Sequence, residues 1–216
     1  MTIGVLNYGF GNLYSITKAL KFLEIEFVLI EPGNREIMNC DRYILPGVGS
    51  FEYGIKKIKE DSQLEYILEK INNGTPLLGI CLGMQLLFSS STEGSLNKGL
   101  DLIQGNCRPF IEQTNFKGKV PHVGFASLNY KNRDIMFKNI LKKPYMYFIH
   151  SYMIPMNDFF KGKDFHIATS NHGGTEFISY IRKKNIIGMQ YHPEKSQGLG
   201  LELIKNFATI PHKKFK

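Results

Sequence analysis

The sequence has little cysteine, no tryptophan and no long apolar run. Its 216 residues include only three cysteines, Cys40, Cys81 and Cys107. An odd number of widely spaced cysteines does not indicate a disulfide framework, and no pair has the CxxC spacing typical of zinc sites. No apolar segment reaches the roughly 18 residues that a membrane-spanning helix needs. These absences argue against a disulfide-stapled secreted domain, a zinc module and a membrane protein.

Targeting and repeat signals are also missing. The chain begins MTIGVLNYGFGN, without the basic stretch and apolar segment of a signal peptide. We therefore expect a cytoplasmic protein. There is no internal repeat, low-complexity tract or linker, so we expect one domain over residues 1–216.

The net charge of +8 comes from 27 Lys and Arg against 19 Asp and Glu. One interpretation is a nucleic acid or another anionic partner. The other is a lysine-rich composition without a specific partner. The lysines are spread along the chain, and the densest group, HKKFK, lies in the last residues. This distribution favours the second interpretation, and we expect no nucleic-acid partner.

Apolar segments and helical patterns alternate in the first half of the chain. The expected strands lie at 3–8, 26–32, within 41–51 and at 76–81, and the expected helices lie at 13–23 (with Asn12 as N-cap), 53–74 (one helix or two) and 82–91. From about residue 97, short strand-like pieces separated by turns follow, and 199–210 reads as a closing helix. The pattern predicts an α/β fold: a mostly parallel open sheet with helices on both faces, and added antiparallel strands in the C-terminal half.

Cys81 stands in the segment PLLGICLGMQLLF, where a strand is expected to turn directly into a helix. A lone buried cysteine is usually a small hydrophobic residue. The G-x-C-x-G pattern, however, has the form of a nucleophile elbow with cysteine in place of serine. Glycines on both sides permit the close backbone approach of such a turn, and a helix N-terminus favours the thiolate. Cys81 is therefore a candidate nucleophile.

His192 and Glu194 are the candidate base and its orienting acid. They stand in GMQYHPEKS, two residues apart. If Pro193 keeps the chain extended, the two side chains lie on the same side, roughly 6.6 Å apart. A carboxylate there can orient the imidazole and stabilise its protonated form. The alternative is a surface histidine beside a solvated glutamate.

The glycine-rich segment PGVGSF, residues 46–51, follows the third expected strand. Its successive N–H groups could bind a developing oxyanion, although glycine and proline also make ordinary βα turns. A glycine-rich loop, a cysteine elbow and a His-Pro-Glu occur here in that order. The α/β-hydrolase order, which places the acid between nucleophile and histidine, does not match, because Glu194 follows His192.

Taken together, these motifs resemble the class I (triad) glutamine amidotransferases over nearly the whole chain. GICLGMQ is shared across that class. NYGFGNLYSI, LPGVGSFEYG, GLDLIQGNC, VPHVG, YFIHSY and QYHPEKSQ most resemble the glutaminase subunits of imidazole glycerol phosphate synthases. The resemblance implies hydrolysis of the side-chain amide of L-glutamine to glutamate and ammonia, with no metal and no cofactor.

The resemblance also implies a role for each matched residue. Cys81 is the expected nucleophile, His192 the expected base and acid, and Glu194 the residue that orients His192. The expected oxyanion hole consists of the N–H of Leu82 and a second N–H group from the segment Gly47, Val48 and Gly49. The residues expected to hold glutamine are Gln85, Glu93, Ser151 and Tyr152.

A partner subunit is also implied. Such glutaminases dock on a (β/α)₈ cyclase that receives the ammonia through a channel and acts in histidine biosynthesis, forming a heterodimer. Asn12 and Lys195 match positions at this interface, and Phe125 stands where the family usually has tryptophan. Ala126 replaces the asparagine that usually follows.

The Phe125–Ala126 replacement leaves the partner open. Phenylalanine keeps an aromatic anchor without the indole N–H, and alanine removes a donor and an acceptor. One alternative is a paralogous glutaminase that supplies ammonia to a surface-glycan precursor. Two others are a cysteine peptidase or hydrolase and a non-catalytic binding module, and the complete set of triad residues argues against the last.

Overall fold

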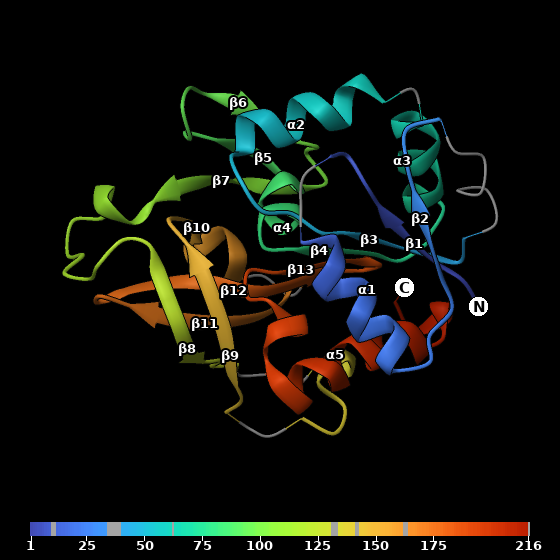
Figure 1. Ribbon diagram of the computed structural model, residues 1–216. Coiled ribbons are helices and arrows are strands. Elements are labelled where there is room, and N and C mark those ends of the chain that lie inside the picture. Colours follow the sequence, from blue (N-terminus) through green and yellow to red (C-terminus); the bar gives the residue numbers. More distant parts are fainter. Residues whose placement is uncertain are drawn as a thin grey trace.

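The computed structural model describes residues 1–9, 12–33, 40–61, 63–130, 134–140, 143–161 and 164–215 (Figure 1). Within them, one sheet has eleven strands and a second sheet has two. The strands of the first half are β1 (Ile3–Leu6), β2 (Phe27–Ile30), β3 (Arg42–Leu45), β4 (Leu77–Ile80), β5 (Phe88–Ser91) and β6 (Asn97–Lys98). Those of the second half are β7 (Ile103–Pro109), β8 (His122–Ser127), β9 (Tyr145–His150), β10 (Tyr152–Pro155), β11 (His166–His172), β12 (Thr175–Lys183) and β13 (Ile186–Met189).

The large sheet has the order β2-β1-β3-β4-β13-β12-β10-β7-β5-β6, with β11 paired to β12. β2, β1, β3, β4 and β13 are parallel. β12 and β10 continue the sheet in antiparallel pairs. The predicted α/β fold, with its mostly parallel sheet and added antiparallel strands, is confirmed. The parallel pairing of β13 with β4 places the chain after β13 beside the end of β4.

Helices cover both faces of the parallel part of the sheet (Figure 1). They are α1 (Leu13–Phe22), α2 (Phe51–Glu60), α3 (Leu64–Asn72), α4 (Leu82–Leu86) and α5 (Gln197–Thr209). α1 and α5 pack on one face, and α2, α3 and α4 on the other. Asn12 caps α1 as predicted, its side-chain oxygen accepting from the N–H of Ser15 at 3.3 Å. Every helix in these segments is too short or too polar to cross a membrane.

The predicted helix over 82–91 is wrong in its second half. α4 ends at Leu86, and Phe88–Ser91 form β5, which pairs with β7 and β6. Three consecutive serines add little to a helix, because serine hydrogen-bonds readily to nearby backbone groups. Phe88 is fully buried among residues of β7 and β12, so sheet pairing and burial outweigh the apolar pattern that suggested a helix.

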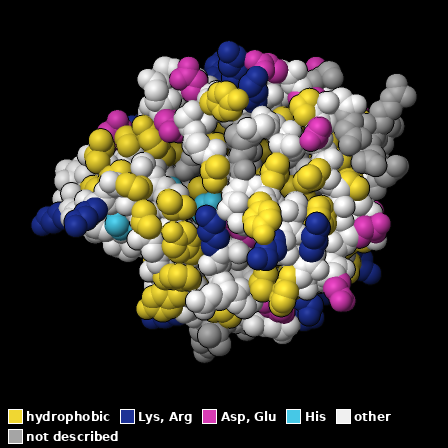
Figure 2. Space-filling model, in the orientation of Figure 1, with side chains coloured by type: hydrophobic (Ala, Val, Ile, Leu, Met, Phe, Trp, Pro, Cys, Tyr) yellow, Lys and Arg dark blue, Asp and Glu magenta, His cyan; other side chains and the backbone are white. Residues whose placement is uncertain are grey.

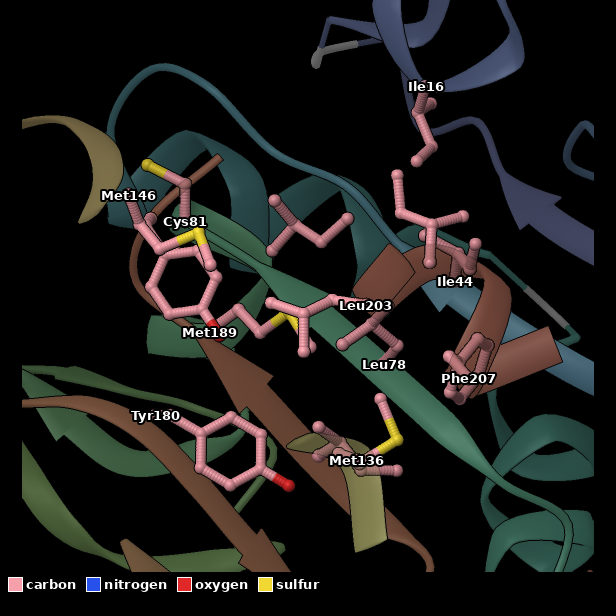
Figure 3. Close-up of a cluster of buried hydrophobic side chains, with 14 of the residues drawn as sticks. Ile16, Ile44, Leu78, Cys81, Met136, Met146, Tyr180, Met189, Leu203 and Phe207 are labelled. Carbon is pink, nitrogen blue, oxygen red and sulfur yellow. The ribbon is translucent and has the colours of Figure 1, made fainter. Parts of the chain in front are cut away.

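The main core lies between the sheet and α1 and α5. It includes Leu78 of β4, Leu203 and Phe207 of α5, and Cys81 itself (Figure 3). Figure 3 shows Cys81 at the same end of this cluster as Met146 of β9. The candidate nucleophile therefore lies at the edge of a packed apolar core, which supports its backbone.

Candidate active site

Cys81 joins β4 to α4 in a strained backbone conformation. Its φ is 53° and its ψ is −110°, outside the regions that residues with a side chain prefer. Such strain persists only where the surroundings enforce it, and it is typical of functional sites. The side chain is 6% exposed. The turn is therefore a sharp strand-to-helix turn of the kind predicted from G-x-C-x-G.

The two glycines that flank Cys81 are required by packing. A Cβ on Gly83 would lie 1.9 Å from the carbonyl oxygen of Leu45, and one on Gly79 would lie 2.6 Å from that of Gly83. A Cβ on Gly47 would lie 2.8 Å from the backbone nitrogen of Gly83. The elbow and the glycine-rich loop are thus in backbone-to-backbone contact. Since no side chain fits between them, the loop lies directly over the first turn of α4.

His192 and Glu194 form a buried hydrogen-bonded pair. The distance from Nδ1 of His192 to Oε1 of Glu194 is 2.7 Å, and both side chains are almost fully buried. The predicted extended path through Pro193 is wrong: residues Pro193–Lys195 form a 3-10 turn, which proline favours at its first position. The turn brings the carboxylate back to the ring, so the pair forms by a different backbone route.

Burial lowers the pKa of His192, but the neighbouring Cys81 and Glu194 outweigh it and raise the pKa to about 10. A raised pKa favours the imidazolium form of His192, which places a positive charge beside the sulfur of Cys81. Nε2 of His192 has no hydrogen-bond partner among the described residues. This nitrogen is therefore available to a reacting group. The arrangement has the chemistry of a cysteine nucleophile with an oriented imidazole.

A cavity of about 300 Å³ opens over Cys81. It brings together eight of the predicted site residues, together with Pro121, Ile149 and His150. The eight are Val48, Gly49, Cys81, Leu82, Gln85, Glu93, Ser151 and Tyr152. Gly47, His192, Glu194 and Asn12 line a smaller space on the other side of the elbow. These predicted residues thus surround one turn of the chain, although they come from six separate segments.

Leu82 and the glycine-rich loop, the predicted oxyanion hole, meet at the cavity over Cys81. Leu82 is the first residue of α4, and the N–H groups of a first helical turn have no partner within the helix. Gly49 has a φ of 107°, a conformation that favours glycine. Val48 and Gly49 line the cavity beside Leu82. The oxyanion hole formed by the N–H of Leu82 and a second N–H from this loop stays a prediction.

Glu93 connects the cavity to α2. Its Oε2 accepts from the N–H of Phe51, the first residue of α2, at 2.8 Å. Burial raises the pKa of Glu93, and the hydrogen bond from Phe51 opposes this shift. A partly buried carboxylate at the wall of the cavity suits a cationic group such as an α-ammonium. Because Phe51 directly follows the glycine-rich loop, Glu93 also fixes the far end of that loop.

Gln85 and His150 converge on the carbonyl oxygen of Tyr152. Nε2 of Gln85 donates to it at 3.0 Å, and Nδ1 of His150 lies 2.7 Å from it. A carbonyl only accepts, so His150 is protonated at Nδ1. His150 lines the cavity but is absent from the sequence-based list of site residues. The signal was available, because FIHSY places His150 immediately before the predicted Ser151–Tyr152 pair.

His150 belongs to a group of three imidazoles. Its Nε2 lies 3.2 Å from Nδ1 of His122, and the ring of His122 stacks on that of His172 with centroids 4.1 Å apart. Burial lowers the pKa of His122 to about 4, assisted by His172, and lowers that of His150 to about 3, with smaller effects from Tyr152 and nearby imidazoles. Both rings are therefore neutral in the folded protein near neutral pH.

These lowered pKa values predict a loss of stability in acid. An unfolded histidine titrates near pH 6.5, so below that pH the unfolded chain binds protons that folded His122 and His150 do not. Their contribution is fully present above about pH 6.5 and is lost as the pH falls toward 4 and 3. Each adds a slope of up to about 1.4 kcal/mol per pH unit.

Urea unfolding measured from pH 8 to pH 4 checks this expectation. The His122→Phe variant keeps an aromatic ring in the stack and should lose stability less steeply with acid than the wild type. The matched control is His212→Gln, because His212 is exposed and its pKa is lowered less. Equal slopes in the wild type and His122→Phe would contradict the assignment.

Two of the three predicted partner residues, Phe125 and Lys195, lie on or beside the β8–β9 sheet. Phe125 is 49% exposed, and its ring packs against Tyr147, with centroids 5.5 Å apart. Nζ of Lys195 lies 6.0 Å from the centre of the Tyr147 ring. Tyr147 therefore contacts both Phe125 and Lys195, although it was not itself predicted from the sequence. The alternation Tyr145, Tyr147, Ile149 along β9 was the signal that could have found it.

The outer face of this sheet is apolar. Val123, Phe125, Tyr145 and Ile149 are each between 41% and 60% exposed. Figure 2 shows hydrophobic side chains gathered over β8 and β9. Exposed apolar patches of this kind mark interaction surfaces. Asn12 lies beside Gly47 and Glu194 and does not line the cavity over Cys81.

Comparisons with known proteins identify the class. The family described as "Glutamine amidotransferase class-I" matches residues 5–210. The chain belongs to the class-I glutamine amidotransferase family, as its motifs predicted. A solved structure described as "Crystal structure of glutamine amidotransferase" has a TM-score of 0.70 at 17% identity, covering 95% of this chain and 98% of that one, which shows the shared fold.

More similar relatives carry a narrower name. The chain is 39% identical to "Imidazole glycerol phosphate synthase subunit HisH" of Geobacillus sp. (strain WCH70), with 96% of each chain covered. It is 41% identical to the protein of the same name from Caldanaerobacter subterraneus subsp. tengcongensis, covering 96% of this chain and 98% of that one. Both relatives are thus similar along nearly their whole length.

Proposed function

We propose that this protein is the glutaminase subunit of an imidazole glycerol phosphate synthase. The observation that carries the proposal is the cavity over Cys81, which places a strained cysteine among a first-turn N–H, a glycine-rich loop and the Glu93 carboxylate. The His192–Glu194 pair stands behind the same cysteine. The names of the full-length relatives support the histidine pathway over the surface-glycan alternative.

The reaction is hydrolysis of the glutamine side-chain amide. The Cys81 thiolate attacks the amide carbon, and the carbonyl oxygen becomes an oxyanion bound by N–H groups of Leu82 and the Gly47–Gly49 loop. The carbon–nitrogen bond then breaks, and Nε2 of His192 gives its proton to the departing ammonia. Water, which gives a proton to His192, then attacks the thioester carbon and breaks the carbon–sulfur bond, releasing glutamate and restoring the Cys81 thiolate and the protonated His192. Glu194 holds the imidazole in the orientation that these steps need.

The cavity offers complementary groups for the rest of glutamine. Glu93 suits the α-ammonium, and the Ser151–Tyr152 segment also lines the cavity. Nε2 of Gln85 donates two hydrogen bonds, one to the carbonyl oxygen of Tyr152 and one to Oε1 of Gln190. The Oε1 of Gln85 is therefore the atom left to contact the substrate. The proposed role of Gln85 is therefore that of an acceptor.

The proposed partner is a (β/α)₈ cyclase subunit, forming a heterodimer in the cytoplasm as part of histidine biosynthesis. Free ammonia is protonated and diluted in water, so a glutaminase that supplies a synthase benefits from direct transfer. The apolar face of β8 and β9 is the surface we assign to docking, with Phe125 and Lys195 both packed against Tyr147. The chain would act as one domain over residues 1–216.

The test is a coupled assay with the cyclase subunit from the same genome. Alone, the protein should release glutamate from glutamine slowly, and adding the cyclase with its ribonucleotide substrate should increase that rate. The gene should also restore growth without histidine to a strain that lacks its own glutaminase subunit but keeps this cyclase. Soluble, partner-bound protein that neither releases glutamate nor restores growth would refute the proposal.

A further inference from the structure

Gln190 contacts the candidate nucleophile but has no part in the reaction steps proposed for Cys81 and His192. It follows β13, two residues before His192, and its side chain is 0% exposed. Its Nε2 lies 3.8 Å from Sγ of Cys81, within range of an N–H···S hydrogen bond. Its backbone N–H donates to the carbonyl of Ser179 at 2.9 Å, which holds it at the end of the sheet. A buried amide therefore points at the sulfur from a rigid element.

The orientation of this amide is set by its neighbours. The carbonyl oxygen of Tyr152 can only accept, so the group of Gln85 that faces it at 3.0 Å is the NH₂. The same Nε2 of Gln85 lies 3.1 Å from Gln190, which must therefore present its oxygen to Gln85. The NH₂ of Gln190 is then directed toward Cys81. One backbone carbonyl thus determines the direction of both side-chain amides.

Sγ of Cys81 has a second polar neighbour, the carbonyl oxygen of Ile149, at 3.9 Å. A thiol can donate to that oxygen, but a thiolate cannot. The amide of Gln190 favours the opposite state, because a thiolate accepts an N–H more strongly than a neutral thiol does. The two neighbours therefore match the two protonation states of the sulfur.

Other titratable groups surround this sulfur. His192 precedes the 3-10 turn and Glu194 lies within it. His150 of β9 and Glu93 both line the cavity. Cys107, whose pKa is raised by burial, is near enough to interact electrostatically with Cys81. Among the described neighbours, Gln190 provides a donor whose charge does not change with pH.

We propose that Gln190 is a positioning residue that stabilises the thiolate of Cys81 and directs it toward the cavity. The proposal rests on the proposed function only in taking Cys81 as the nucleophile. Gln190 adds a fixed N–H to the contribution of His192, in a place that excludes water. Its effect belongs to the resting enzyme, before glutamine binds.

The test measures alkylation of Cys81 by iodoacetamide as a function of pH, followed by mass spectrometry of the peptide that carries Cys81. Gln190→Met keeps the volume of the side chain but removes the N–H, and Gln190→Asn keeps an amide that is too short to reach Sγ. Both should raise the midpoint of the profile by about one pH unit, so that alkylation near pH 7 slows roughly tenfold. The limiting rate at high pH should not change.

Ser179→Ala is the matched control. Ser179 is fully buried and its Oγ donates to the carbonyl of Ala168 at 3.0 Å, whereas the hydrogen bonds of Cys81 Sγ among the described residues are with Ile149 and Gln190. The Ser179→Ala substitution removes a buried hydrogen bond next to Gln190 and should leave the midpoint of the alkylation profile unchanged. An unchanged midpoint in either folded Gln190 variant would overturn the proposal.

A measurement on the unaltered protein covers the case in which neither Gln190 variant folds. The side-chain amide resonance of Gln190 should shift with pH at the same midpoint as Cys81 alkylation, and a resonance that stays constant through that midpoint overturns the proposal. Alkylation and the resonance require neither glutamine nor the partner. A failed glutaminase assay with a normal Gln190 effect would therefore reject the proposed function and leave this inference intact.

Discussion

Replacing Cys81 with alanine is expected to reduce glutamate release from glutamine by at least about a thousandfold, even in the presence of the cyclase. The substitution removes the only sulfur in the cavity wall among the described residues. Without it, no covalent intermediate can form, and binding of the transition state by N–H groups alone recovers only a small part of the rate. The measurement is the initial rate of glutamate production by the complex.

Two controls keep this result interpretable. Cys40→Ala removes another buried cysteine, which packs beside Gly4 and Tyr43 of the first strands and should leave the rate nearly unchanged. The complex that carries Cys81→Ala should still make product from added ammonia, because the cyclase reaction does not need the thiol. Substantial glutamine turnover in the Cys81→Ala complex would refute the assignment of the nucleophile.

Gly83→Ala is expected to destabilise the fold by about 3 kcal/mol or more, or to prevent folding. The new Cβ would lie 1.9 Å from the carbonyl oxygen of Leu45. The clash cannot be relieved by rotating a side chain, because that oxygen belongs to the backbone of β3, which is paired on both sides. The free energy of unfolding from urea titrations measures the effect.

Gly198→Ala is the matched control for that substitution. Gly198 lies in the first turn of α5, and no atom lies within 4 Å of a Cβ built there. Alanine is a better helix former than glycine, so this variant should be as stable as the wild type or more stable by roughly 0.5–1 kcal/mol. If Gly83→Ala unfolds at the same urea concentration as Gly198→Ala, the packing argument for the elbow is wrong.

Much of the site could be predicted from the sequence because its chemistry depends on local patterns. Cys81 could be recognised because an elbow needs small residues on both sides of its nucleophile, and the clashes at Gly79 and Gly83 give the physical reason. His192 and Glu194 could be paired because they are two residues apart. The alternation of strands and helices predicted the parallel sheet. In each βαβ unit the spacing of the apolar residues changes from that of a strand to that of a helix and back again.

Other features could not be predicted because they depend on what packs nearby. The helix after Cys81 ends at Leu86, since sheet pairing of Phe88–Ser91 outweighs their local preference. Pro193 starts a 3-10 turn instead of extending the chain. In both cases the local sequence allows two conformations, and tertiary contacts choose between them.

The sequence by itself determined the candidate nucleophile, its candidate base and the family, because these depend on residue types at short spacings. Only the tertiary structure decided which groups meet at the sulfur. Gln190 reaches Cys81 because β13 pairs in parallel with β4, although the two residues are 109 positions apart. Its direction is set by Gln85 of α4 and the carbonyl of Tyr152 in β10. Such hydrogen bonds depend on distances between segments, which no local pattern in the chain specifies.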